Sequence, residues 1–288
     1  SYKEIETAFQ TGKIKLAVVL PNQFGEDLQH MNKASVQLIA DASDPNVANT
    51  LTNYATAVIM DYQNRITNDQ KLPYTIKVET RMLYNPQLKG AYNFVPGVMA
   101  MVLLLVCTMM TAITIVREKE MGTMEILLVS PMKPQMIVFA KAVPYLLLST
   151  INIASILLLS VYALEVPING SLLLLVSESI LFTLVSLSLG LLISSAAESQ
   201  QVAMFISLVA LFLPTVMLSG FMFPIENMPL PLCVVSNIVP AKWYYHIVKS
   251  VMIQGVGIAD IWKETLVLAG MMIFFLTVAV KRFKIRLQ

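Results

Sequence analysis

Carboxylates at helical spacing mark the segment from Arg117 to Pro134, which separates two long apolar runs. On a helix, Glu118, Gly122 and Glu125 would share one face, beside an apolar face of methionines and leucines. Carboxylates make charge-assisted hydrogen bonds, and a glycine between them lets another surface come close. We therefore expect a short amphipathic helix over residues 117–131 at a membrane surface, with a shape that suits docking of a protein partner. The alternative is a helix that lies on the lipid interface and binds no protein.

Glu178 is the charged residue of an otherwise uncharged, serine-bearing stretch from Ser171 to Ser195. A carboxyl group at membrane depth costs about 2 to 4 kcal/mol unless it is paired or hydrated, so Glu178 is a candidate for contact with a transported molecule. The alternative is a carboxyl near the outer headgroups, or a protonated one bonded to a helix neighbour. Methionine and phenylalanine adapt to varied apolar surfaces, although lipid-facing or core packing explains them equally well. The residues assigned to a candidate substrate path are Met109, Glu178, Phe205, Phe212 and Met217.

The sequence has no motif that cradles ATP phosphates or activates a hydrolytic nucleophile. G-x-x-x-x-G-K-[ST], H-E-x-x-H and G-x-S-x-G are all absent. Cys107, Cys233, His30 and His246 are scattered, so we expect no metal site and no disulfide framework. The net charge of +2 is too small to indicate nucleic-acid binding. We expect a chain that is not an enzyme and that holds no cofactor itself.

The composition is that of a membrane protein, because 56% of the 288 residues are hydrophobic and 13% are charged, against roughly 25% charged in soluble domains. Beyond Gly90, long charge-free runs predict an α-helical transmembrane domain over residues 91–288 with five spans. The expected spans are about 94–116, 136–162, 171–195, 200–223 and 262–281.

Residues 1–90 have the pattern of a soluble α/β domain. Tyr2 to Gln10 predicts a helix, and alternating residues predict strands near 14–20, 36–40 and 76–82. Asp44 followed by Pro45 predicts the start of a long helix. The apolar residues expected to pack that helix on the sheet are Val47, Leu51, Tyr54, Val58, Tyr62 and Ile66.

Basic residues fix the expected orientation. They flank the 117–134 connection and follow the last span, so both regions belong in the cytoplasm by the positive-inside rule. The connection from Pro224 to Asp260 and the α/β domain then lie outside. A folded domain outside the membrane needs an earlier signal to carry it across, so we expect a first span ahead of Ser1, giving six in all.

The outer connection, residues 224–260, is too apolar to be simply solvated. Two short helices that dip back into the outer leaflet would satisfy its backbone groups. Trp243, Tyr244 and Tyr245 would then stand at headgroup level.

Four motifs, in order along the chain, resemble those of type-2 (ABC-2) exporter permeases. They are Leu83-Tyr-Asn-Pro, Val95-Pro-Gly, the segment from Glu118 to Pro131, and Leu218-Ser-Gly-Phe-Met-Phe-Pro. The resemblance assigns the second-last of these to an ATPase-docking coupling helix, with residues Arg117, Glu118, Glu120, Gly122, Thr123, Glu125, Ser130 and Pro131. It assigns the last to an outer gate motif, with residues Leu218, Ser219, Gly220 and Pro224.

The resemblance implies a permease subunit in the inner membrane of a bacterium, which forms the substrate path as a dimer with a second copy or a sibling permease. ATP and Mg would be bound by separate ABC ATPase subunits, and a periplasmic adaptor would be a further partner. Hydrophobic drugs, lipids and polymers are the substrate classes left open. The alternative is a membrane-anchored binding or assembly protein whose external domain carries the function.

Overall fold

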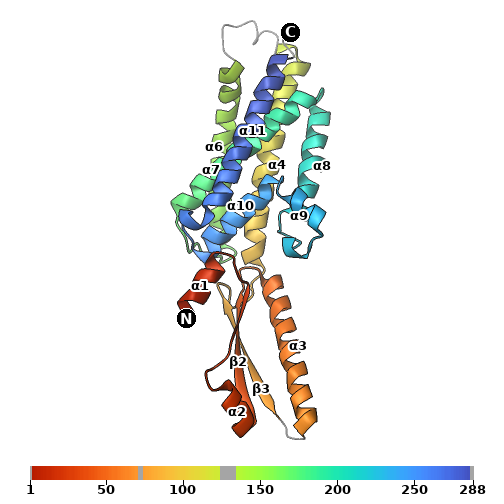
Figure 1. Ribbon diagram of the computed structural model, residues 1–288. Helices are drawn as coiled ribbons and strands as arrows, with labels where there is room; N and C mark the ends of the chain where they lie inside the picture. Colours follow the sequence, from red (N-terminus) through yellow and green to blue (C-terminus); the bar gives the residue numbers. More distant parts are fainter. Residues whose placement is uncertain (1, 71–73, 124–133, 286–288) are drawn as a thin grey trace. The chain divides into compact units, whose positions relative to one another are not determined.

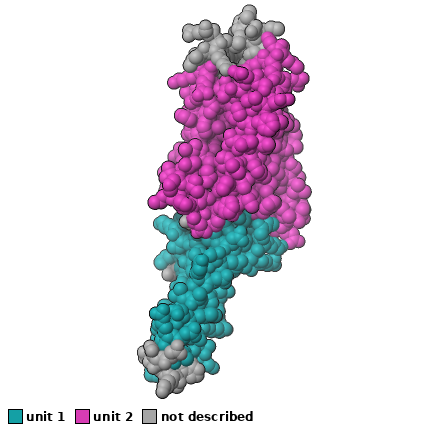
Figure 2. Space-filling model, turned by 90° about the vertical axis from the view of Figure 1, so that its right-hand side faces the viewer, with its two compact units in different colours: residues 1–93 teal, residues 94–288 magenta. Residues whose placement is uncertain are grey.

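The computed structural model describes the chain except for residues 1, 71–73, 124–133 and 286–288 (Figure 1). It divides into two compact units, residues 1–93 and 94–288, which are coloured separately in Figure 2.

The N-terminal unit is a three-stranded sheet with helices. Strands β1 (Leu16–Val19) and β2 (Lys33–Asp41) are antiparallel, whereas β2 and β3 (Thr75–Leu83) are parallel, in the order β1-β2-β3. Helix α1 (Tyr2–Gln10) has the predicted bounds, and α3 (Pro45–Gln70) links the parallel strands. Helix α2 (Phe24–Met31) was not predicted. The three strands lie where the alternating residues predicted them.

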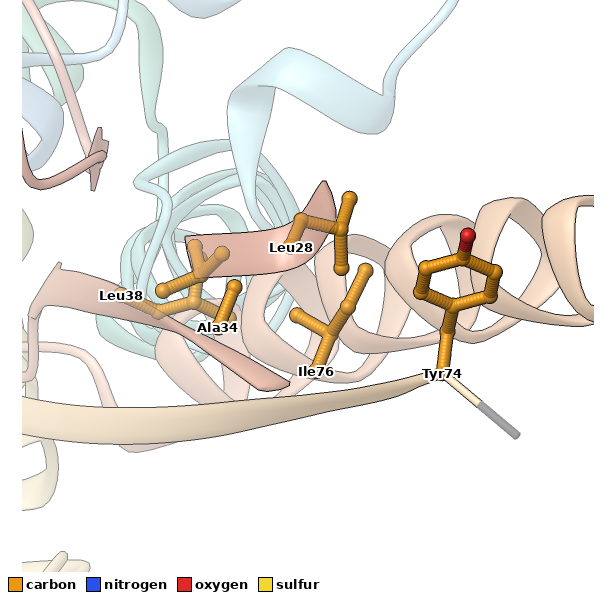
Figure 3. Close-up of a cluster of buried hydrophobic side chains, with 6 residues drawn as sticks. Leu28, Ala34, Leu38, Tyr74 and Ile76 are labelled. Carbon is orange, nitrogen blue, oxygen red and sulfur yellow. The ribbon is translucent and has the colours of Figure 1, made fainter. Parts of the chain in front are cut away.

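The core of this unit lies on one face of the sheet. Leu28, Ala34, Leu38, Tyr74 and Ile76 gather there (Figure 3). From α3, the residues packed against this cluster are Ala55, Ile59 and Ile66.

Helix α3 is rotated relative to the sequence prediction. Asp44 caps its start, since one carboxylate oxygen accepts the amides of Asn46 and Val47 at 3.1 and 3.3 Å. Tyr54, Val58 and Tyr62 were expected to face the sheet, but they are 69%, 69% and 50% exposed. The prediction was wrong for these three residues because α3 carries two neighbouring apolar stripes with the same helical spacing, whereas Ile66 does pack against the cluster.

The second unit contains the membrane helices. They are α4 (Ala91–Glu120), α6 (Pro134–Tyr162), α7 (Leu172–Ala196), α8 (Gln200–Leu218) and α11 (Ile258–Ile285). Within the described residues, five helices are long and apolar enough to cross a membrane, which confirms the predicted number. Helix α8 ends before residue 223 because Gly220 adopts a left-handed conformation with φ +85°.

Helix α7 lies at the centre of this unit and contacts α6, α8 and α11 (Figure 1). It also crosses α4 closely at Gly190, where an added Cβ would stand 2.6 Å from the Thr108 carbonyl oxygen. The Thr108 hydroxyl donates to the Ser186 carbonyl at 2.9 Å. Small and hydroxyl-bearing residues therefore join α4 to α7, as is common where membrane helices approach closely.

The outer connection does contain two short helices, α9 (Leu230–Ser236) and α10 (Pro240–Lys249). A 3₁₀ turn (Ile225–Asn227) precedes them, and a π-helical turn (Ser250–Gln254) leads towards α11. Tyr244 was expected at headgroup level, and in the structure its side chain is fully buried and stacked on Phe182 at 4.1 Å between ring centroids. Tyr244 lies on the apolar face of an amphipathic helix that packs against α7.

Candidate functional site

The C-terminal end of α4 differs from the predicted docking helix. Residues 117–120 form the last turn of the membrane helix, and Gly122 follows with φ +71° while its amide donates to the Lys119 carbonyl at 3.2 Å. A residue in the left-handed region ends an α-helix, so one continuous helix over 117–131 is interrupted here. In the described part of the chain, no atom lies within 4 Å of a Cβ built on Gly122. The left-handed conformation of Gly122 therefore lets the chain turn after the end of α4.

The predicted docking residues have different surroundings. Arg117 and Thr123 are exposed, and the Thr123 hydroxyl donates to the Glu118 carbonyl at 3.3 Å. Glu118 is half-buried. The remaining three members of the predicted set, Glu125, Ser130 and Pro131, lie outside the described residues.

Glu120 and its neighbour Lys119 bind the short turn between α7 and α8. One carboxylate oxygen of Glu120 accepts the backbone amide of Gln200 at 2.9 Å, and the other accepts the Gln200 side-chain amide. The Lys119 ammonium donates to the Ser194 carbonyl. Both side chains thus bind polar groups at helix ends.

A small apolar cluster lies beside these contacts. Four side chains of this cluster are fully buried and pack with Ile193. They belong to Ala112 and Val116 of α4, Ala197 in the turn and Ala203 of α8. The short alanine side chains let the three helix ends approach closely.

Glu178 is buried between α7 and α11, with 4% of its surface exposed. One carboxyl oxygen accepts the Thr265 hydroxyl at 2.9 Å, and the other is buried with no hydrogen-bond partner among the described residues. Next to it on α7, the Ser179 hydroxyl bonds with the Tyr244 hydroxyl at 2.7 Å. Burial raises the pKa of the Tyr244 phenol, so this group is a neutral hydrogen-bonding partner.

The residues of the predicted substrate path are not brought together within one chain. Phe205, Phe212 and Met217 are 60%, 41% and 46% exposed on α8. Met109 is half-buried on α4, whereas Glu178 is covered by α11. Phe205 and Phe212 are seven residues apart and so share one face of α8, whereas Met217 lies off that face.

The outer gate motif forms a compact corner at the end of α8. Leu218 is the last residue of the helix, Ser219 accepts the Phe221 amide at 3.3 Å, and Pro224 precedes the 3₁₀ turn. A Cβ on Gly220 would lie 3.2 Å from the Ile225 side chain. The Phe221 ring fills the space above Gly97 of α4, where an added Cβ would be 1.9 Å away. The motif therefore joins the outer ends of α8 and α4.

The sequence prediction missed several partners of these residues. Thr265, Tyr244 and Gln200 each bind a residue far away in the sequence, and helical periodicity carries no information on such pairs. For Gln200, a signal existed, since Glu198-Ser-Gln forms a polar turn between two apolar runs.

No group of three or more potential metal ligands of the His, Cys, Asp or Glu type occurs among the described residues. His246 approaches Glu264 at 3.7 Å between Nδ1 and Oε1. Cys107 and Cys233 are free thiols.

Comparison with known proteins places these features in one family. The profile of the family described as ABC-2 family transporter protein matches residues 1–281. The probable multidrug ABC transporter permease YbhS of Escherichia coli K12 is 35% identical over 256 residues, which cover 88% of this chain and 68% of the relative. YbhR of the same strain, also named a probable multidrug ABC transporter permease, is 32% identical over 264 residues, covering 92% and 72%. ABC transporter G family member 20 of Dictyostelium discoideum is 28% identical over 239 residues, covering 80% of this chain and 33% of the relative. Because the family profile spans nearly the whole sequence, the chain belongs to the ABC-2 family of transporter proteins.

Proposed function

We propose that the chain is the membrane-spanning permease subunit of an ATP-driven exporter. Support comes from the family, from relatives named as multidrug ABC transporter permeases, and from five helices able to cross a membrane in the described residues. The sequence has no P-loop, so the ATP and Mg would be bound by a separate ATPase subunit.

The observation that carries this proposal is the course of α4. One helix runs from Ala91 to Glu120, so its last turn is also the first part of the proposed docking segment, residues 117–131. A displacement of that turn would therefore act directly on a membrane helix. ATP binding would favour an outward-open arrangement through contacts that differ between the two states, since a ligand shifts an equilibrium only by such a difference.

The exposed face of α8 supports a paired arrangement. Its large apolar residues, among them Phe205 and Phe212, are uncovered within one chain. We propose that two copies, or this chain and a sibling permease, enclose the path between them, and that its substrates are hydrophobic drugs, lipids or polymers. The assembly would lie in the inner membrane of a bacterium, with the α/β unit and the 224–260 connection outside, where a periplasmic adaptor would bind.

The docking proposal is tested at Gly122. A β-branched residue is strained at φ +71°, at a cost of about 1–3 kcal/mol, whereas asparagine tolerates this region. We expect Gly122→Val to reduce co-purification of the ATPase subunit about tenfold, and Gly122→Asn to leave it within about twofold of wild type. Both variants should insert normally, because the spans on either side are unchanged. Normal co-purification of Gly122→Val at normal expression would contradict docking through this segment.

Glu125→Lys probes the same segment through its charge. The substitution would replace an attraction with a repulsion, and losing one charge-assisted contact costs roughly 1.5 to 3 kcal/mol. We expect it to weaken ATPase binding about tenfold or more without affecting insertion.

A further inference from the structure

Two consecutive side chains of opposite charge, Lys119 and Glu120, bind the two ends of the turn between α7 and α8. Ser194 lies in the last turn of α7, and its carbonyl receives the Lys119 ammonium. Gln200 is the first residue of α8, and its amide is accepted by Glu120 at 2.9 Å. A helix end leaves its last carbonyls and first amides without partners inside the helix. Each side chain therefore supplies a partner that the helix itself lacks.

The charges also match the two helix dipoles. A cation is favourable at the carboxyl end of a helix, and an anion is favourable at the amino end. Lys119 stands at the carboxyl end of α7 and Glu120 at the amino end of α8. Exchanging the two charges would oppose both dipoles, so the order of the pair suits this turn.

Apolar packing makes the same connection. The fully buried side chains of Ala112 and Val116 on α4 pack with Ala197 in the turn and Ala203 on α8. The last turns of α4, the end of α7 and the start of α8 are thus held by both apolar and polar contacts.

We propose that these three helix ends, residues 112–120, 193–196 and 197–203, form one rigid joint. A movement of the docking segment then reaches α8, and not α4 alone, through Glu120 and Gln200. Since α8 carries Phe205 and Phe212 on its exposed face, the joint connects the docking segment to the candidate substrate-facing helix. Glu120 is a positioning residue in this scheme, not a contact to the ATPase. The inference rests on the proposed permease function.

A pairwise exchange of donor and acceptor tests the joint. In Gln200→Glu, two carboxylates face each other, whereas in Glu120→Gln two amide groups face each other and, because an amide both donates and accepts, still form a hydrogen bond. In the double variant, the side-chain amide of residue 120 donates to the carboxylate of residue 200. The amide oxygen of residue 120 still accepts the backbone amide of residue 200. Gln201→Glu is the matched control, because it adds the same charge to the same turn at an exposed position for which no contact with Glu120 is seen.

The measurement uses the complete transporter in proteoliposomes. We expect Gln200→Glu, which lies outside the docking segment, to bind the ATPase and hydrolyse ATP as wild type does, while the amount of substrate transported per ATP falls about tenfold. The double variant should recover to within about twofold of wild type, and Gln201→Glu should match wild type. A general loss of stability would lower hydrolysis and transport together, without changing their ratio.

Two results would overturn the joint. One is an unchanged transport-to-hydrolysis ratio in Gln200→Glu. The other is a parallel loss of ATPase binding in Glu120→Gln, which would place Glu120 in the docking surface itself.

A second readout does not depend on the ATPase. Amide hydrogen exchange at Gln200 should accelerate about tenfold in Glu120→Ala, because that variant removes the carboxylate that accepts the Gln200 amide. If exchange is unchanged in Glu120→Ala, the joint is wrong even where the permease function holds. If wild type fails to bind any ATPase while exchange behaves as expected, the proposed function fails and the joint stands as a structural contact.

Discussion

Glu178 is almost fully buried, and among the described residues one of its carboxyl oxygens has a hydrogen-bond partner and the other has none. The Thr265 hydroxyl serves one oxygen at 2.9 Å, and the described residues offer the other no partner. A buried polar atom without a partner costs about 1–3 kcal/mol, so the carboxyl is retained at a cost in stability. Such an atom marks a candidate for contact with a substrate group in another state of the transport cycle.

We predict that Glu178→Gln changes transport of some substrates while ATPase binding stays at wild-type level. The amide keeps the size of the side chain and its contact with Thr265, but it cannot carry a charge. Thr265→Val is the matched control, because it removes the hydroxyl and leaves the carboxyl in place. Transport assays over a panel of substrates, with co-purification of the ATPase, provide the measurement. Unchanged transport for every substrate that wild type moves would show that Glu178 only packs α7 against α11.

At the scale of helices, α4 and α7 are joined by the close approach of their backbones at Gly190. A Cβ at Gly190 would stand 2.6 Å from a backbone oxygen and 2.8 Å from the Thr111 Cβ, and neither can move without displacing α4. Gly270 lies in α11 in a different situation, since no described atom lies within 4 Å of an added Cβ.

These two glycines give a matched pair of substitutions. We predict that Gly190→Ala lowers the free energy of unfolding by about 1–3 kcal/mol, because it overpacks the crossing. Gly270→Ala should be neutral or raise that free energy by up to about 1 kcal/mol, because alanine favours a helix. Thermal unfolding in detergent measures both. Equal stability of the two variants would contradict the α4–α7 crossing.

Elements were more predictable from the sequence than the way in which they pack. Charge-free runs predicted the five membrane helices, and alternation predicted the three strands, because both signals are local. The face of α3 could not be predicted, since the stripe containing Tyr54 and Val58 has the same spacing as the one containing Ile59 that meets the sheet. The burial of Tyr244 depends on its stacking against Phe182, a residue far away in the sequence.

At the candidate site, too, the sequence predicted the segment but not the partners of its residues. The segment from Arg117 was found from its charges, but the role of Glu120 depends on Gln200, which no periodicity connects to it. Gly122 was predicted as a place for close approach of a partner, and the structure adds that its left-handed conformation follows the end of α4. A single sequence does not distinguish these two uses of glycine.

At the scale of the whole molecule, orientation in the membrane is open to a direct test. With Cys107 and Cys233 replaced by serine, Val58→Cys and Met121→Cys each offer one exposed thiol, at positions 69% and 62% exposed. The distribution of basic residues predicts that position 58 faces outward and position 121 inward. An impermeant maleimide should label position 58 in cells with a permeabilised outer membrane, and position 121 only after disruption of the inner membrane. Labelling of position 121 under the first condition would reverse the proposed topology.

The central claim is that this permease moves its substrate with energy from a separate ATPase. The most direct measurement is substrate transport in proteoliposomes that contain the purified chain, the purified ATPase subunit, or both. We predict ATP-dependent transport with both proteins, none with either protein alone, and none with both when ATP is replaced by a non-hydrolysable analogue. ATP-dependent transport by the chain alone, or failure of the ATPase to bind it and to support transport, would contradict the claim.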